Sequence, residues 1–372
     1  MLLRSPHVPR RPPTWPALVR AQARLPLGLA AAYDGPVLGG IVGVLAGKVR
    51  EDAATVGGVP ASVFRPGQGQ GPWPAVVLFP GITRRGRAHP ALRAIGRGLA
   101  ATGRLAIVAE PEGLATGELT PTSVLQARAA VEEALSRRDV AQGRVALVGV
   151  SGGGTLALLT AADPRLAEQV SIVLALAPLN DVSEAIRVIT TGIYRDGDTL
   201  VPFASGDFFK LVIAKSVVAC LQPGDERTAL RSRLQSLDDY APEPLAHLRE
   251  WPRDGLGAPA RAAVELLSND VPERFDDLYA ALPEALRTAV DLLSPITVAT
   301  KIAAPVELVV ARADKYIALA DALSFAKTCP TARLTILESL THVVPTISPT
   351  AARDLARFDG ILVRLLAAAY SW

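Results

Sequence analysis

The stretch Gly149-Val150-Ser151-Gly152-Gly153 is the feature that most constrains the fold of this chain. An apolar run at 145–148 comes directly before it, and a helical pattern at 155–162 follows. A serine at a sharp turn from a buried strand into a helix is the G-x-S-x-G nucleophile elbow in the context that it requires. Small residues on either side avoid collisions in so tight a turn. We therefore expect Ser151 to present its hydroxyl at a sheet edge, above a helix N-terminus that favours developing negative charge.

Apolar runs alternate with helical patterns on both sides of this turn. The sequence predicts a hairpin at 49–64, turning at Gly57-Gly58. Further strands are predicted at 75–79, 105–109, 170–177, 305–310 and 333–337. Helices are predicted at 90–102, 120–138, 319–327 and 350–369. Strands that are apolar on both faces and alternate with helices are typical of a mostly parallel sheet with helices on both faces.

The stretch 182–294 interrupts this alternation. It has no convincing apolar strand, and its helical patterns at 207–221, 225–238, 259–268 and 283–293 indicate a helical insertion. We therefore predict a catalytic core at 49–181 and 295–372, with a helical cap inserted at 182–294. Residues 1–48 are predicted to be an N-terminal extension, with a loose Pro- and Arg-rich tail over 1–26 and an apolar helix.

Composition excludes several classes of protein. A chain of 372 residues with 49% hydrophobic and 20% charged residues is not disordered. The net charge of +3 is small, and much of the basic excess lies near the N-terminus, so we predict no nucleic-acid surface. The spacing of Cys220 and Cys329 is not that of a metal site or a redox motif. Two cysteines do not form the disulfide framework that would indicate a secreted protein. We expect no metal and no cofactor, and nothing in the sequence indicates an oligomeric state.

Residues 25–47 are nearly all apolar, but Asp34 and Pro36 interrupt them. The uncharged stretch that remains, Gly35 to Gly47, has 13 residues, whereas a spanning helix needs about 20. We favour packing on the catalytic core and a cytoplasmic protein. Peripheral membrane contact through this segment is the alternative.

A serine nucleophile needs a histidine base, and the chain has four histidines. His7 lies in the tail, His89 begins a helix and His247 lies in the insertion. His342 follows the last predicted strand, and loops after parallel strands share one edge of the sheet with the elbow. We therefore assign the base to His342.

The carboxylate that orients this histidine should lie at the same edge. Asp314 follows the strand at 305–310 and precedes His342 by 28 positions. The order Ser…Asp…His is that of the α/β-hydrolases. Asp181, after the strand at 170–177, is the alternative.

Two backbone N–H groups should bind the oxyanion. One is that of Gly152, directly after the nucleophile. The other belongs to the Pro80-Gly81-Ile82-Thr83 loop after the strand at 75–79, and we assign it to Ile82, with Thr83 next.

With these residues the chain resembles an α/β-hydrolase, and its short core connections are similar to the dienelactone-hydrolase and prolyl-oligopeptidase-like esterase branch. The match covers about 49–181 and 295–372. One departure is Phe-Pro-Gly in the oxyanion loop, where many relatives have His-Gly. The insertion matches no named cap.

The resemblance implies a serine hydrolase that cleaves small-molecule carboxylic esters through an acyl-enzyme. The alternatives are an acyltransferase or a peptidase using the same triad, or a non-catalytic binding protein on a hydrolase fold. We expect the insertion to cover Ser151 as a lid, and Phe208, Phe209 and Trp251 to contact the substrate.

Overall fold

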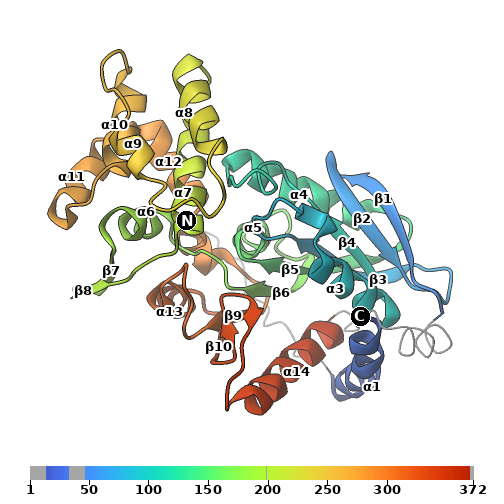
Figure 1. The fold of residues 1–372 in the computed structure, drawn as a ribbon. Coiled ribbons are helices and arrows are strands. Elements are labelled where there is room, and N and C mark those ends of the chain that lie inside the picture. Colours follow the sequence, from blue (N-terminus) through green and yellow to red (C-terminus); the bar gives the residue numbers. More distant parts are fainter. Residues whose placement is uncertain (1–13, 33–46, 198, 369–372) are drawn as a thin grey trace, which may run out of the picture.

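The computed structural model describes residues 14–32, 47–197 and 199–368. Its centre is an eight-stranded sheet in the order β1-β2-β4-β3-β5-β6-β9-β10 (Figure 1). The strands are β1 (Arg50–Val56), β2 (Val59–Arg65), β3 (Trp73–Phe79), β4 (Leu105–Ala109), β5 (Val140–Val150), β6 (Val170–Leu176), β9 (Val306–Ala311) and β10 (Ala332–Leu337). The strands from β4 to β10 run parallel, while β1 and β2 form an antiparallel hairpin at one end. The predicted mostly parallel sheet is confirmed.

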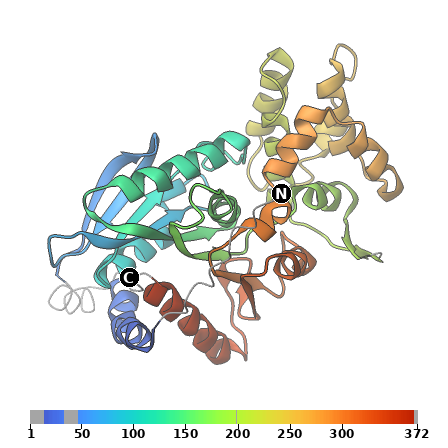
Figure 2. The ribbon, with the colours of Figure 1, turned by 180° about the vertical axis from the view of Figure 1, so that it is seen from behind.

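Helices cover both faces of this sheet, as Figures 1 and 2 show. On one face lie α4 (Pro121–Ser136), α5 (Gly152–Ala161) and α13 (Leu319–Thr328), and on the other α1 (Trp15–Ala32), α3 (Pro90–Ala101) and α14 (Ala351–Ala368). The alternation of side chains along a strand explains the two layers. Val77 and Leu147 face the α5 side, whereas Val76 and Val148, their neighbours in sequence, face the α14 side.

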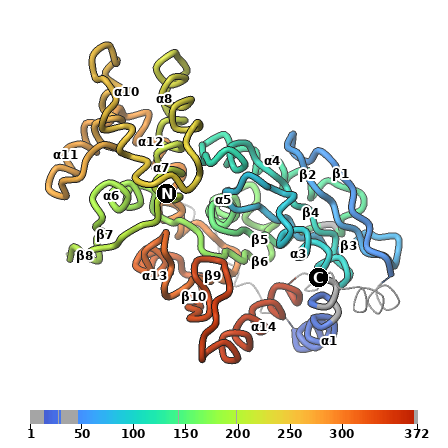
Figure 3. Tube along the Cα trace, viewed as in Figure 1, coloured from blue at the N-terminus to red at the C-terminus, as the bar shows by residue number. Residues whose placement is uncertain are grey.

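The segment between β6 and β9 forms a lobe of helices beside the sheet (Figure 3). Its elements are α6 (Val182–Thr191), β7 (Ile193–Asp196), β8 (Thr199–Pro202), α7 (Asp207–Ala219), α8 (Asp225–Gln235), α9 (Ala246–Arg249), α10 (Ala258–Leu267), α11 (Phe275–Ala280) and α12 (Glu284–Leu292). Helices thus occur at all four predicted positions. The β7–β8 hairpin was not predicted, because its residues are mostly exposed and form no apolar run. Short 3-10 turns at Gly86–Ala88, Pro272–Arg274 and Pro295–Lys301 complete the connections.

The N-terminal helix corrects one expectation. α1 begins at Trp15, inside the stretch expected to be a loose tail. Ala17, Ala21 and Leu25 recur every four residues and are buried, so one face of the helix packs beside α3 and α14. The rest of the expected apolar helix, residues 33–46, lies outside the described residues. None of the described helices has the length and apolar character that crossing a membrane requires.

Candidate active site

Ser151 occupies the turn between β5 and α5, with φ of 52° and ψ of −124°. A non-glycine residue in this region is strained, and it persists only where the surroundings enforce it. The glycines around it explain the enforcement. A Cβ at Gly149 would lie 2.1 Å from the carbonyl oxygen of Gly153, and a Cβ at Gly153 would lie 2.2 Å from that of Phe79. Both obstacles are backbone atoms that cannot move aside, so the turn requires glycine at both positions.

Two backbone N–H groups beside Ser151 are free. In the hydrogen bonds of the described residues, neither Gly152 nor Ile82 donates its N–H to a protein acceptor. The two residues are in contact, since a Cβ at Gly152 would lie 3.1 Å from Cγ1 of Ile82. Thr83, the second choice for the other donor, gives its N–H to the carbonyl oxygen of Leu114 at 3.2 Å. Of the two residues considered, only Ile82 therefore keeps a free donor.

His342 and Asp314 are brought together from two loops at the same sheet edge. Nδ1 of His342 lies 2.7 Å from Oδ2 of Asp314, and both side chains are buried. The other carboxylate oxygen of Asp314 accepts the N–H groups of Tyr316 at 2.8 Å and Ile317 at 3.2 Å. These contacts fix the carboxylate, and a donor at Nδ1 leaves Nε2 of His342 as the basic nitrogen.

Asp181, the alternative carboxylate, has a different role. It is the N-cap of α6, and its Oδ1 accepts the N–H of Glu184 at 3.1 Å and the hydroxyl of Ser183 at 2.7 Å. Its own N–H donates to Asp321 at 2.9 Å. Asp181 therefore serves the helix terminus, while Asp314 contacts His342.

Ser151 and His342 are not joined in the structure: across the described chain, no hydrogen bond links the Ser151 hydroxyl with His342. Tyr316 packs edge-on against His342, with ring centroids 5.0 Å apart. The same ring contacts Phe208 at 5.8 Å and Phe209 at 6.4 Å. Tyr316 thus connects the histidine to the insertion. Its position two residues after Asp314 could have drawn attention to it, but its ring contacts depend on tertiary packing.

Ser151 lies in a narrow pocket between the core and α7. The cavity volume is about 40 Å³. Because one water molecule requires about 10–15 Å³, the cavity has room for only a few water molecules. Its lining includes Ile82, Gly152, Phe208 and Phe209. Val212, Ile213 and Ser216 of α7, which sequence reasoning missed, also line it. Nothing in their helical pattern separates pocket-facing positions from core positions, since most of α7 is buried.

Trp251, which the sequence predicted to contact the substrate, does not line this pocket. It follows α9, its N–H donates to Leu248, and its side chain packs in the core near α10. An aromatic residue in a helical block is commonly a core residue, and only the fold of the insertion decides which of its aromatics reach Ser151.

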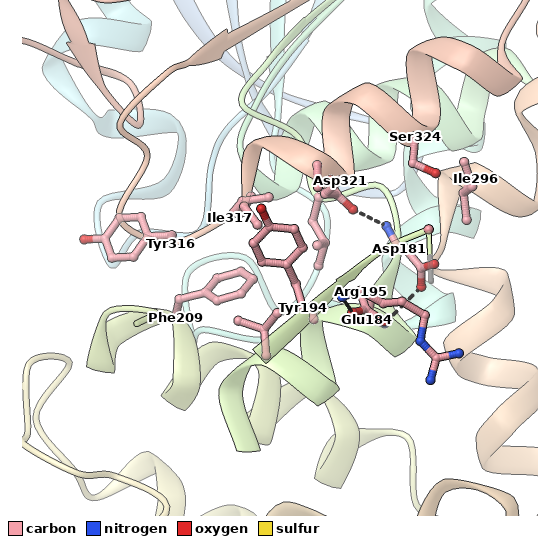
Figure 4. Close-up of a pocket in the computed structure, with 16 residues that line it drawn as sticks. Asp181, Glu184, Tyr194, Arg195, Phe209, Ile296, Tyr316, Ile317, Asp321 and Ser324 are labelled. Carbon is pink, nitrogen blue, oxygen red and sulfur yellow. Dashed lines mark hydrogen bonds between the residues drawn. The ribbon is translucent and has the colours of Figure 1, made fainter. Parts of the chain in front are cut away.

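A second pocket, of about 220 Å³, borders the first through Leu179, Phe209 and Ile317 (Figure 4). Asp181, Glu184 and Asp321 line it. Burial raises the pKa of Asp321 to about 7, although the carboxylate accepts the N–H groups of Asn180 and Asp181. Burial also raises the pKa of Glu184. Over the described ranges, no group of three or more His, Cys, Asp or Glu side chains could hold a metal ion.

No protein-family model matches the chain, and no curated protein sequence matches it. Many solved structures are similar at low identity, and three of them illustrate the range. Est1E from Butyrivibrio proteoclasticus is 14% identical, over 85% of this chain and 99% of that one, with a TM-score of 0.48. An esterase from Pyrobaculum calidifontis is 16% identical, over 94% and 91%, with a TM-score of 0.47. A putative dienelactone hydrolase from Klebsiella pneumoniae is 15% identical, over 87% and 99%, with a TM-score of 0.46.

With TM-scores below 0.5 and identities of 14–16%, these structures carry no argument about the fold or the substrate of this chain. The arrangement of the chain itself is the stronger observation. β5 lies inside a mostly parallel sheet and ends in a strained serine that begins a buried helix. Asp314 and His342 follow β9 and β10 at the same edge. With this sheet and this turn, the chain has the α/β-hydrolase fold.

Proposed function

We propose that this protein is a serine hydrolase that cleaves carboxylic esters through an acyl-enzyme. The observation that carries the proposal is the strained backbone of Ser151 beside two free N–H groups, those of Gly152 and Ile82. A fold can retain a strained residue at a functional site because the geometry serves the chemistry. The contact between Asp314 and His342 adds a base of the kind that a serine requires.

In the proposed reaction, Oγ of Ser151 attacks the ester carbonyl carbon while Nε2 of His342 takes its proton. Asp314 holds the Nδ1–H and stabilises the imidazolium that forms. The carbonyl oxygen becomes an oxyanion and accepts hydrogen bonds from Gly152 and Ile82. His342 then returns the proton to the leaving alcohol. Water, activated by the same imidazole, releases the acid and restores Ser151. These steps use side chains and backbone groups alone.

The proposal includes a change of conformation, because Ser151 and His342 are not hydrogen-bonded in this state. Catalytic hydrogen bonds often tighten only when the substrate is bound. The contacts of Tyr316 with both His342 and the phenylalanines of α7 suggest the route. A substrate that fills the pocket presses on Phe208 and Phe209, and Tyr316 transmits the displacement to the imidazole. The insertion therefore acts as a cap over the serine.

Pre-steady-state turnover of p-nitrophenyl acetate tests the mechanism. If the acyl-enzyme forms faster than it is hydrolysed, p-nitrophenol appears in a burst of one equivalent per protein, followed by slower turnover. Where no burst appears, rapid acid quenching followed by mass spectrometry should still detect the acetylated protein. Turnover without an acetylated serine under either condition contradicts the acyl-enzyme.

A further inference from the structure

Lys215 of α7 is a buried cation without a close partner. Its side chain is 4% exposed, and within the described residues its ammonium makes no hydrogen bond. Its nearest carboxylate oxygen belongs to Asp239, at 3.9 Å. Burial lowers the pKa of this lysine below its ordinary value. Because burying a charge is costly unless it is paired, an ammonium in this position has free capacity to bind an anion.

Lys210, on the same helix, shows the usual arrangement. Its ammonium lies 2.9 Å from Asp207 and 3.3 Å from Glu243. Asp239 lies farther from Lys215, at 3.9 Å, and both of its oxygens accept hydrogen bonds from Arg84, at 2.6 Å and 3.1 Å. Of the two lysines of α7, Lys215 is therefore the one whose ammonium makes no hydrogen bond within the described residues.

Lys215 lines a pocket of about 240 Å³. Arg84 and Asp239 also line this pocket, together with Thr83, Thr116 and Gln235. Two cations and one carboxylate therefore face the cavity, which gives its lining a net positive charge. Glu118 lies nearby, but it is held by Arg231 at 2.7 Å and by Gln235 at 2.9 Å. The pocket therefore favours an anion.

This pocket adjoins the one that contains Ser151. Ile82 and Phe208 line both cavities. Ile82 carries one of the free N–H groups beside the serine, and Phe208 belongs to the same helix as Lys215. Gly117 lies against the lysine, since a Cβ there would lie 3.2 Å from Cδ of Lys215 and 3.4 Å from its ammonium nitrogen. The two cavities are therefore neighbours that share Ile82 and Phe208 in their linings.

We propose that this pocket is a carboxylate-binding subsite and that the substrate is an ester that also bears a carboxylate. The inference deepens the proposed ester hydrolysis and, for the identity of the substrate, rests on it. Lys215 is the main ligand of the carboxylate, and Arg84 adds positive charge at the pocket entrance. Asp239 competes with the substrate for both cations. The uncleaved part of the substrate is thereby anchored on the insertion while its ester lies at Ser151.

Direct binding tests the subsite without relying on catalysis. Glutarate is titrated by calorimetry into the Ser151→Ala protein and into the same protein with Lys215→Met, which keeps the length of the side chain and removes its charge. A hydrogen bond to a charged group predicts an affinity loss of about 10- to 100-fold. Lys210→Met, on the same helix, is the matched control and should leave the affinity at its starting value. Equal glutarate affinity with and without Lys215, or no glutarate binding, overturns the subsite.

Asp239→Asn gives an effect of opposite sign and remains informative if Lys215→Met does not fold. Removing the competing carboxylate should tighten glutarate binding several-fold. Unchanged or weaker binding contradicts the assignment.

Kinetics then connect the subsite to the reaction. The ratio of kcat/KM for p-nitrophenyl glutarate to that for p-nitrophenyl valerate compares a carboxylate with a neutral end in the acyl part. The same ratio for 3-acetoxypropanoate and butyl acetate compares them in the alcohol part. Lys215→Met should lower one of these ratios about 10- to 100-fold, mainly through KM of the anionic ester, and Lys215→Arg should restore most of it. Ratios that do not respond in either series overturn the role in substrate selection.

Glutarate binding without turnover of any ester would instead contradict the proposed function and leave the subsite standing.

Discussion

Two regions of different character meet at Ser151: the turn between β5 and α5 in the core, and helix α7 in the insertion. In the turn, backbone atoms lie so close that added Cβ atoms at Gly149 and Gly153 would come within 2.2 Å of them. On α7, by contrast, only side chains reach the pocket, and they do so from a helix that packs like any other. In the proposed mechanism, the core therefore fixes the reacting groups, whereas the insertion shapes what reaches them. Substitutions in the core should therefore change the rate for every ester, and substitutions in the insertion should change selectivity.

Ser151→Ala is expected to have the largest effect. Loss of the nucleophile should lower kcat by a factor on the order of 10⁴–10⁶ for all esters alike. The fold should remain, since the change removes one hydroxyl that makes no hydrogen bond as a helix cap. Steady-state kinetics on esters of several chain lengths, with circular dichroism as the control, test this. A variant that keeps turnover within tenfold of wild type would remove the turn from the mechanism.

The two carboxylates at the sheet edge come next. Asp314→Asn should cost about 10⁴ in kcat, because an amide favours the wrong tautomer of His342. Asp181→Asn is the matched variant and should affect stability more than rate, since Asp181 caps α6. Both are measured on one ester at saturating concentration. The reverse ranking would transfer the orienting role to Asp181.

The stability of the protein should depend on pH through a carboxyl group at the junction between the core and the insertion. Asp321 of α13 accepts the N–H groups of Asn180 and Asp181, where the chain leaves the core for the insertion. Its pKa is about 7 in the folded protein, against about 3.9 in an unfolded chain. The folded state therefore binds the proton more tightly, so stability is highest where the group is protonated in both states and falls as pH rises from about 4 to about 7.

Asp321→Asn removes this titration. The free energy of unfolding of the variant, relative to wild type, should rise by an amount on the order of 4 kcal/mol between pH 4 and pH 8. Urea unfolding at a series of pH values measures it. A difference that stays constant over this range would show that burial does not shift this carboxyl.

The close packing of backbone atoms around the Ser151 turn can be tested by measuring the free energy of unfolding, without an activity assay. Gly153→Ala places a Cβ 2.2 Å from the carbonyl oxygen of Phe79, and we expect a loss of about 3 kcal/mol or more in the free energy of unfolding. Gly360→Ala in α14 is the control. Its nearest neighbour is the flexible end of Arg364 at 3.4 Å, so helix propensity should make it neutral or stabilising by up to about 1 kcal/mol. Equal effects of the two substitutions would refute the steric account of the turn.

The smallest effects belong to the insertion. Phe208→Ala and Phe209→Ala enlarge the pocket around Ser151, and each should shift the preferred acyl chain length by about one or two methylenes, worth about 0.8 kcal/mol each. Trp251→Ala, outside the pocket, serves as the control and should leave the profile unchanged. The measurement is kcat/KM over p-nitrophenyl esters of increasing length. Superimposable profiles for both phenylalanine variants would mean that the core alone builds the pocket.

The same contrast explains what the sequence could predict. Apolar runs and the serine turn are local features of the sequence. They predict the strands of the core and the positions of Ser151, Asp314 and His342 at strand ends. The contact between Asp314 and His342 agrees with that expectation. Their roles in catalysis stay predictions.

The insertion was much less predictable. Its helices could be placed along the sequence, but their packing decides that Phe208 reaches Ser151 and that Trp251 does not. Lys215 resembled any other lysine of an amphipathic helix until the structure placed it beside Arg84 and Asp239. The ring contact between Tyr316 and His342 also depends on tertiary packing. Periodicity reports which residues are helical, and it does not report what faces a helix from elsewhere in the chain.

The central claim is that Ser151 is an activated nucleophile, and covalent labelling tests it most directly. The folded protein is treated with a fluorophosphonate, and the modified peptide is identified by mass spectrometry. Ser151 should be the labelled residue, at one equivalent per protein, and both His342→Ala and Ser151→Ala should abolish labelling. A protein that hydrolyses esters while it carries the label on another residue, or no label at all, would contradict the account.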